Sequence, residues 1–314
     1  MVATASPATR RGWRRYSSRT FYLFVAPWVL GFGLLTALPL VYALGISLTN
    51  FNGVSDRWRW VGLRNYAELL GDTDAIASLL RTLAYTAIAV PLTVGGGLGL
   101  AVLLNRRLKA VGLFRTIFFL PSVVPVVAMA IMWKLIFNRD AGILNAILEK
   151  ISVTPISWLV DPNAFYALII LTLWGLGGGM VIMLAALQGV PSELEEAALV
   201  DGASRWRVFR HITVPMISPV IFFQVVTGVI ASFQVIIQPL LLAQTNQVGR
   251  VAEVPQSTHL FMVQVYQEFF SGNRYGYGSA MLWMFFLVIL AVTLVVLRSS
   301  RLWVYYEVDG EADR

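Results

Sequence analysis

Six long stretches without a charged side chain constrain this sequence more than any other feature. They run from Thr20 to Ser55, Thr82 to Asn105, Thr116 to Trp133, Pro162 to Ser192, Ile212 to Gly249 and Tyr275 to Leu297. A transmembrane helix needs about 20 mainly apolar residues, and each stretch can hold one, the third with help from Leu135 to Phe137. Charged residues make up 13% of the chain, roughly half the share of a typical soluble domain. The sequence therefore predicts an all-α integral membrane protein with six transmembrane helices.

Lysine and arginine are unevenly distributed among the segments that join these helices. With the N-terminus inside, the inner segments include residues 1–19, 106–115, 205–210 and 298–314. Together the inner segments hold roughly twice as many Lys and Arg as the outer ones, the excess that cytoplasmic loops of membrane proteins carry. This bias predicts that both termini, and the polar segment 188–215, lie in the cytoplasm.

Several kinds of chemistry are disfavoured by what the sequence lacks. It has no cysteine, and its two histidines, His211 and His259, lie far apart, so we expect neither a metal site nor a cofactor bound by this chain. The uncharged stretches contain no Asp, Glu or His, which ion-coupled transporters usually keep inside the membrane. No phosphate-binding loop of the form GxxxxGK[ST] occurs. Uphill transport would therefore need energy from another polypeptide, and a stand-alone secondary transporter or a membrane-embedded enzyme is a less favoured alternative.

Two glycine clusters, Gly95–Gly99 and Gly175–Gly179, lie inside apolar stretches. No strand pattern precedes them, so they do not resemble phosphate loops. Each contains a GxxxG step, which lets helices approach one another closely in lipid. We interpret both clusters as helix-packing positions.

The fifth stretch carries four polar side chains at helical spacing, namely Gln224, Thr227, Gln234 and Gln238. Their spacing places them on one face of a continuous helix. Polar amides that face lipid are unfavourable, so we expect this face to meet protein or water. Two interpretations stay open. The side chains either form hydrogen bonds between helices or line a path for an uncharged, hydroxyl-rich solute.

A polar segment, residues 191–215, interrupts the apolar pattern. Ser192 and Glu195 have the spacing of a capping box at the start of a helix. Gly202 predicts the end of that helix, because glycine adopts the left-handed conformation without steric cost. Ser204 then predicts the cap of a second helix. A DNA-binding helix-turn-helix is disfavoured on the cytoplasmic face of a membrane protein, so no nucleic-acid partner is expected. Two interpretations remain, a plain surface loop and a docking element for a cytoplasmic partner. The well-defined helix starts and stop favour docking.

The same segment resembles the EAA motif of permease subunits in bacterial binding-protein-dependent ABC importers. In that motif E-A-A is followed by three residues and G, then by nine residues and I-x-L-P. The motif positions in this sequence are Glu196, Ala197, Ala198, Gly202, Ile212 and Pro215, with Val214 in place of leucine, and Asp201 and Ala203 flank the motif glycine. The resemblance implies that these residues couple the permease to an ATP-hydrolysing subunit.

Further stretches are similar to the carbohydrate-uptake branch of this family, the relatives of maltose and glycerol-phosphate importer permeases. They are Leu120 to Leu148, Trp158 to Pro162 and Tyr275 to Ala280. The predicted outer loop 244–258 departs from the family, which often has a T-x-G-G-P turn there. The resemblance implies a sugar or polyol as solute. An ABC permease for phosphate, an amino acid or a compatible solute is the alternative.

The resemblance also implies an organisation. The expected fold is the type I ABC importer permease fold (MetI-like), with residues 1–76 forming a basic cytoplasmic N-terminus, the first transmembrane helix and an outer loop. Residues 77–300 would form the permease core with five transmembrane helices and the cytoplasmic EAA loop (188–215), and residues 301–314 a cytoplasmic tail.

The implied partners, in a bacterial cell membrane, are a second homologous permease, two copies of a cytoplasmic ATP-binding subunit that uses the ATP, and an extracytoplasmic solute-binding protein. This chain would itself not be an enzyme.

Overall fold

The computed structural model describes residues 18–55, 58–106, 109–243 and 253–305. The α-helices are α1 (Ser18–Phe32), α2 (Leu38–Ser47), α3 (Arg64–Gly71), α4 (Thr73–Leu104), α5 (Val111–Phe119), α6 (Val126–Ile136), α7 (Ile143–Lys150), α8 (Asn163–Trp174), α9 (Gly177–Gln188), α10 (Ser192–Val200), α11 (Arg205–Val208), α12 (Val214–Phe233), α13 (Ile237–Leu242), α14 (Phe261–Phe270) and α15 (Tyr275–Trp303). Single π-helical turns cover Gly33–Ala37 and Phe209–Thr213, and 3₁₀ turns cover Leu120–Val123 and Gln256–Thr258. Within these described ranges the predicted all-α class is confirmed.

Four of the described helices are long and apolar enough to cross a membrane. They are Arg19–Ser47, Thr73–Leu104, Arg205–Phe233 and Tyr275–Trp303. Two further pairs qualify only when each is taken together. Val111–Val123 and Val126–Ile136 are bent by 101°, and Asn163–Trp174 and Gly177–Gln188 by 45°. The described part of the chain thus holds four candidate spans, or up to six if each bent pair is one span.

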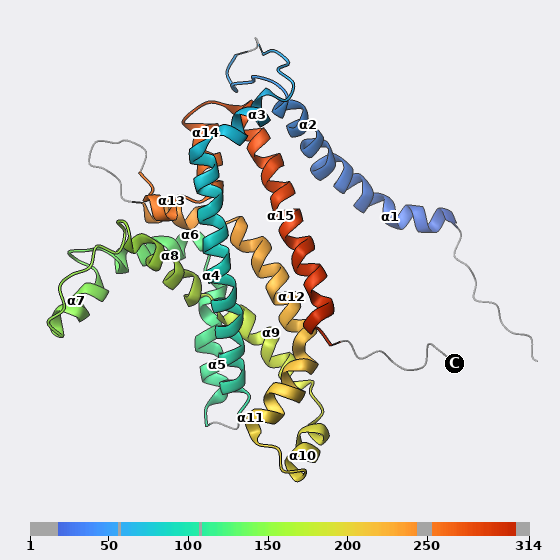
Figure 1. Cartoon of the computed structure of the whole chain (residues 1–314), viewed down its shortest axis with the longest axis vertical. Helices are drawn as coiled ribbons and strands as arrows, with labels where there is room; N and C mark the ends of the chain where they lie inside the picture. Colours follow the sequence, from blue (N-terminus) through green and yellow to red (C-terminus); the bar gives the residue numbers. More distant parts are fainter. Residues whose placement is uncertain (1–17, 56–57, 107–108, 244–252, 306–314) are drawn as a thin grey trace, which may run out of the picture.

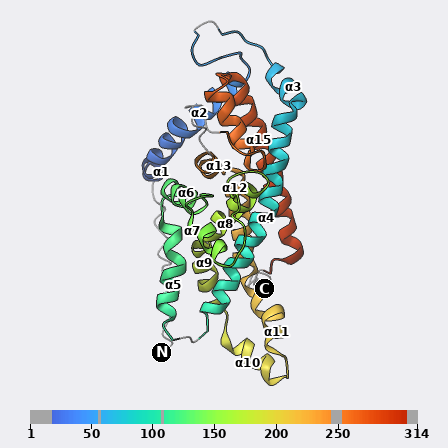
Figure 2. The ribbon, with the colours of Figure 1, turned by 90° about the vertical axis from the view of Figure 1, so that its left-hand side faces the viewer.

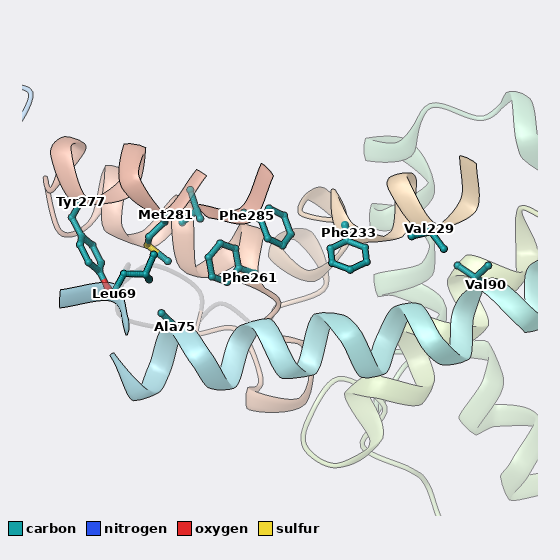
Figure 3. Packing of buried hydrophobic residues seen from close by; sticks show 10 residues of the cluster. Leu69, Ala75, Val90, Val229, Phe233, Phe261, Tyr277, Met281 and Phe285 are labelled. Atoms are coloured by element: carbon teal, nitrogen blue, oxygen red, sulfur yellow. The ribbon is translucent and has the colours of Figure 1, made fainter. Parts of the chain in front are cut away.

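The long helix α4 lies at the centre of the bundle and packs against α8, α9, α12 and α14 (Figures 1 and 2). Toward its N-terminal end, Phe261 of α14 stacks on Phe285 of α15 with ring centroids 4.5 Å apart. Phe233, the last residue of α12, lies 5.7 Å from the same Phe285 ring. Figure 3 shows these rings in a row along α4. Buried aromatic pairs stabilise a fold beyond the apolar area that they bury, so this cluster joins α12, α14 and α15 to α4.

Glycines permit the closest approaches in the bundle. The bend between α8 and α9 places Gly177 against the end of α5, where a Cβ atom would overlap the carbonyl oxygen of Phe118. The backbone of α9 lies 3.5 Å from the Cβ position of Gly97 in α4. The packing interpretation holds at these two positions, whereas nothing lies within 4 Å of the Cβ positions of Gly95 and Gly99.

The helix formed by α1 and α2 stands apart from the other spans. It leaves the bundle at an angle (Figure 1), and none of its most apolar window is buried. Phe24 and Leu35 are 80% and 81% exposed. Its contacts within the chain are made chiefly by α2, which packs against α15. The apolar surface of α1 is therefore free to meet lipid or another polypeptide.

Candidate functional site

The 191–215 loop begins with α10, at the end of the molecule opposite α3 and α14 (Figure 1). Pro191, not Ser192, occupies the N-cap position, and no side chain caps this helix. The predicted capping box is therefore wrong. Because Ser192 is already helical, its hydroxyl cannot play the capping role. Glu195 instead accepts a hydrogen bond from the hydroxyl of Thr213 at 2.7 Å.

The turn after α10 is closed by its backbone. Gly202 has φ +83°, in the region where glycine alone carries no Cβ penalty. The amide of Ala203 donates to the carbonyl of Ala198 at 2.9 Å, and the amide of Gly202 to the carbonyl of Leu199 at 3.1 Å. This pair of bonds is the Schellman motif, which satisfies the last carbonyls of a helix. The predicted glycine stop is confirmed, one residue after the C-cap Asp201.

The second half of the loop is the beginning of a candidate span. Ser204 caps it as predicted, since its hydroxyl oxygen accepts from the amide of Arg207 at 3.4 Å. From Arg205 the helix continues to Phe233, and a π-helical turn precedes Pro215. Proline lacks an N–H and crowds the carbonyl four residues before it, which the wider turn accommodates. Ile212 and Pro215 are thus half-buried parts of a long helix, not of a separate short one.

The loop presents both polar and apolar side chains to solvent. Glu196, Ala197, Asp201 and Gly202 are exposed, and Ala198 and Ala203 are half-buried. Val200 and Trp206 are 87% and 67% exposed. An exposed apolar patch with a charged rim is typical of a protein–protein contact. The Glu195–Thr213 bond and the continuous helix connect this surface to the span that contains α12.

The four side chains predicted to form one stripe do not share a helix. Gln224 and Thr227 lie in α12, but this helix ends at Phe233, Gln234 is its C-cap, and Gln238 lies in α13. The prediction of a continuous helical face is therefore wrong.

The amide of Gln224 donates to the carbonyl of Gly179 in α9 at 3.1 Å, which is a bond between helices. Gln224 also lines a cavity of about 130 Å³ with Thr93, Gly97, Gly175, Gly179 and Gly228. The Thr227 hydroxyl donates to Phe223 in its own helix. Among the described residues, the Gln234 and Gln238 side chains have no hydrogen-bond partner, so the structure leaves their amide groups available.

A polar junction that the sequence interpretation missed lies near the 244–258 segment, of which residues 244–252 fall outside the described residues. The carboxylate of Asp161 accepts from the amides of Gln256 at 2.7 Å and Ser257 at 3.0 Å. Arg81 donates to the side chain of Gln256 at 2.8 Å and to the carbonyl of His259 at 3.3 Å. Burial alone would raise the pKa of Asp161, but its hydrogen bonds and the Arg81 charge hold that pKa below its ordinary value. In the sequence, this junction is marked only by the positions of Asp161 and Arg81, each of which directly precedes an uncharged stretch.

A second polar network joins α3, α14 and α15 at the same end. Arg274 pairs with Glu68 and, at 3.3 Å, with Glu268. Its guanidinium also lies 4.1 Å from the centroid of the Tyr277 ring. The Tyr277 hydroxyl donates to Asp72 at 2.5 Å. These residues brace the helix ends around the start of α15.

Comparison with known proteins identifies the family to which this chain is similar. Residues 92–304 match the family described as "Binding-protein-dependent transport system inner membrane component". The chain is 36% identical to the probable ABC transporter permease protein YesP of Bacillus subtilis, over 92% of this chain and 93% of YesP. It is 32% identical to the trehalose/maltose transport system permease protein MalF of Thermococcus litoralis, over 89% and 93%.

A solved structure shares the fold. It is the crystal structure of a bacterial alginate ABC transporter in complex with an alginate pentasaccharide-bound periplasmic protein, with a TM-score of 0.79, 21% identity, and coverage of 90% of this chain and 94% of that one. The family match covers more than half of the chain, and relatives above 30% identity cover nearly all of it. The chain therefore belongs to the family of binding-protein-dependent transport system inner membrane components.

Proposed function

We propose that this protein is the permease subunit of an ATP-driven importer of a sugar or polyol, and that it forms half of the translocation path. The observation that carries the proposal is the 191–215 loop. It presents an exposed surface around Glu196, is closed by a Schellman turn at Gly202, and continues without a break into the helix Arg205–Phe233. A motor that moves this loop would move a membrane span with it.

The proposed topology has six spans and both termini in the cytoplasm. Each bent pair then counts as one span, and the predominance of basic residues near the loop ends sets the orientation. The chain contains no cysteine, so single cysteines at Ser55 and Ser204 can be labelled separately. An impermeant reagent added to intact cells should label position 55 and not position 204. The reverse result would contradict the topology.

The proposed partners are a second homologous permease, two copies of an ATP-binding subunit and an extracytoplasmic solute-binding protein. ATP would be hydrolysed by the ATP-binding subunits, and this chain would not catalyse a reaction. The family description supports the binding protein. The unburied α1 surface and the exposed 191–215 loop offer two separate faces for partners within and outside the membrane.

A sugar or polyol is the substrate class that the relatives favour. Their names include trehalose/maltose, arabinooligosaccharide and lactose transport systems. The candidate path residues Gln224, Thr227, Gln234 and Gln238 are uncharged and can both donate to and accept from hydroxyl groups. Uptake of labelled oligosaccharides by liposomes that contain the assembled complex tests the class. Uptake of an amino acid or phosphate in their place would favour the alternative permease.

The coupling role has its own test in Glu196→Lys, with Glu193→Lys as the matched control in the same helix. Both changes reverse an exposed charge near the start of α10, where negative charge is favoured. If the motif position contacts the motor, only Glu196→Lys should weaken retention of the ATP-binding subunit and abolish uptake. Wild-type retention and uptake in both variants would make the 191–215 segment a plain surface loop.

A further inference from the structure

A cavity lies beside the 191–215 loop, and its two arginines and its apolar wall have no role in the proposed transport path. Its volume is about 520 Å³, and it lies between the C-terminal end of α4 and the α10–α11 region. Its polar and aromatic lining includes Asn105, Arg106, Glu195, Arg205 and Trp206. Its apolar lining includes Val102, Leu187, Leu199, Val208 and Phe209. The cavity is therefore amphipathic, with charged groups and an apolar wall in one space.

The charged groups of this cavity are not balanced within the part of the chain that the structure describes. The guanidinium groups of Arg106 and Arg205 are exposed and have no hydrogen-bond or ion-pair partner among the described residues. Glu195, the one carboxylate in the described lining, accepts from the Thr213 hydroxyl and keeps its negative charge, so the two arginines leave the described lining with an excess of positive charge. Arg115 donates to the carbonyl of Leu104 at 3.2 Å, which offsets the negative end of the α4 dipole. The cavity is thus suited to an anion.

Its position in the fold adds a second constraint. The candidate span Thr73–Leu104 ends and the candidate span Arg205–Phe233 begins at this cavity. We take these two helix ends to lie at the level of the lipid head groups, because both flank candidate spans and carry arginines, which are enriched beside the cytoplasmic ends of spans. A free inorganic anion would leave the apolar wall exposed to water, whereas the first part of a lipid acyl chain would cover it. Basic pockets between transmembrane helices bind anionic lipid head groups in this way.

We infer that this cavity binds the phosphate head group of an anionic phospholipid, with Arg106 and Arg205 contacting the phosphate and Val102, Leu187 and Val208 contacting the start of the acyl chain. The bound lipid would connect the end of α4 to α11, beside the 191–215 loop. This inference goes beyond transport itself, because it assigns the cavity a lipid ligand.

Lipid retention by the assembled complex, including its ATP-binding subunits, tests the inference. The complex is exchanged into nanodiscs of phosphatidylcholine with or without phosphatidylglycerol, extracted mildly, and analysed by native mass spectrometry for bound phosphatidylglycerol. The double variant Arg106→Gln with Arg205→Gln should bind phosphatidylglycerol roughly 25-fold more weakly, since each basic residue near an anionic lipid surface contributes about a factor of five. Arg207→Gln, an exposed arginine outside the cavity lining, is the matched control and should bind as the wild type does.

A second measurement needs no substitution. A photoactivatable phosphatidylglycerol should crosslink to the wild-type complex within residues 102–106 and 205–209. Equal phosphatidylglycerol binding by wild type and double variant, or crosslinks confined to other helices, would overturn the inference. Displacement of the lipid by millimolar inorganic phosphate would replace it with a soluble anion site. Loss of the ATP-binding subunit from the double variant, with unchanged lipid binding, would assign the arginines to the motor contact. Transport is not a readout here, so a negative result leaves the proposed function standing.

Discussion

The hydroxyl of Thr213 donates a hydrogen bond to Glu195 Oε1 at 2.7 Å, and this bond ties α10 to the helix that becomes α12. Thr213 is buried, with 6% of its surface exposed, so the bond is shielded on one side. It is a contact between two elements that also meet through the Gly202 turn. Together the two connections make α10 and the start of the span a single unit.

Replacement of Thr213 by valine should loosen this unit without disturbing its packing. Valine has a similar shape but no donor, and a hydrogen bond to a charged group contributes about 1.5–3 kcal/mol. We expect the variant to assemble with its ATP-binding subunits but to hydrolyse more ATP for each solute transported. Thr213→Ser keeps the hydroxyl and is the control. A wild-type ratio of hydrolysis to uptake in Thr213→Val would show that the bond has no part in coupling.

Gly202→Val should strain the turn after α10. The Cβ position is open, with nothing within 4 Å, so the cost comes from the backbone alone. A branched side chain at φ +83° is unfavourable by about 1 kcal/mol or more. The helix end should shift, and retention of the ATP-binding subunit on a pull-down should fall. Asn tolerates positive φ, so Gly202→Asn should retain the subunit better. Identical retention by all three proteins would argue against a need for this turn.

Asp161 should make the junction with Gln256 and Ser257 sensitive to acid. Its pKa is lowered in the folded protein, so the ionised carboxylate stabilises the fold. This contribution is complete above the ordinary carboxyl pKa of about 3.9 and is lost as the pH falls through the lowered folded value. Asp161→Asn should cost about 1 kcal/mol at neutral pH, since the site is exposed.

The measurement for Asp161 is thermal unfolding of the purified complex between neutral pH and about pH 3. The difference between the wild type and Asp161→Asn should shrink on acidification. Asp140→Asn changes an exposed carboxylate without a side-chain partner among the described residues, and it should leave the profile unchanged. A difference that is constant with pH would show that the Asp161 charge does not stabilise the junction.

Helix ends, which depend on residues close together in the chain, could be predicted from the sequence in most cases. Gly202 and the cap at Ser204 were predicted correctly because helix ends are governed by local backbone chemistry. The cap at Ser192 was predicted wrongly because Pro191 takes the extended N-cap conformation, which moves the helix start by one residue. The Asp161 junction could not be predicted, since its partners lie 95 and 96 residues away in the chain.

The broken polar stripe shows a signal that was present but not used. Pro239 lies five residues after Gln234 and inside α13. Proline cannot donate to the carbonyl four residues before it, and its ring collides with that carbonyl. Pro91 and Pro219 nevertheless lie inside the continuous helices α4 and α12, so Pro239 alone was a weak sign that the helix ends after Phe233. Local residues also mark the bends within the third and fourth apolar stretches, namely Pro121 and Pro125 in the third and Gly175 and Gly177 in the fourth. The angle of the fourth depends in addition on tertiary contacts such as the one at Gly177.

Substitution of the candidate path glutamines separates packing from transport. Gln224 bonds to Gly179, and such a bond within a membrane contributes about 0.6 kcal/mol on average. Gln224→Leu should therefore lower the amount of folded complex slightly. The amides of Gln234 and Gln238 have no partner among the described residues, so Gln234→Leu or Gln238→Leu should leave the amount of complex unchanged. If these two line the path, uptake per assembled complex should fall or change in sugar preference. Thr116→Val, which removes a hydroxyl bonded within its own helix and outside the candidate path, is the control. A solute with many hydroxyl groups should be transported differently once a free amide beside its path is lost. Unchanged uptake per assembled complex in both Gln234→Leu and Gln238→Leu would therefore remove these residues from the path.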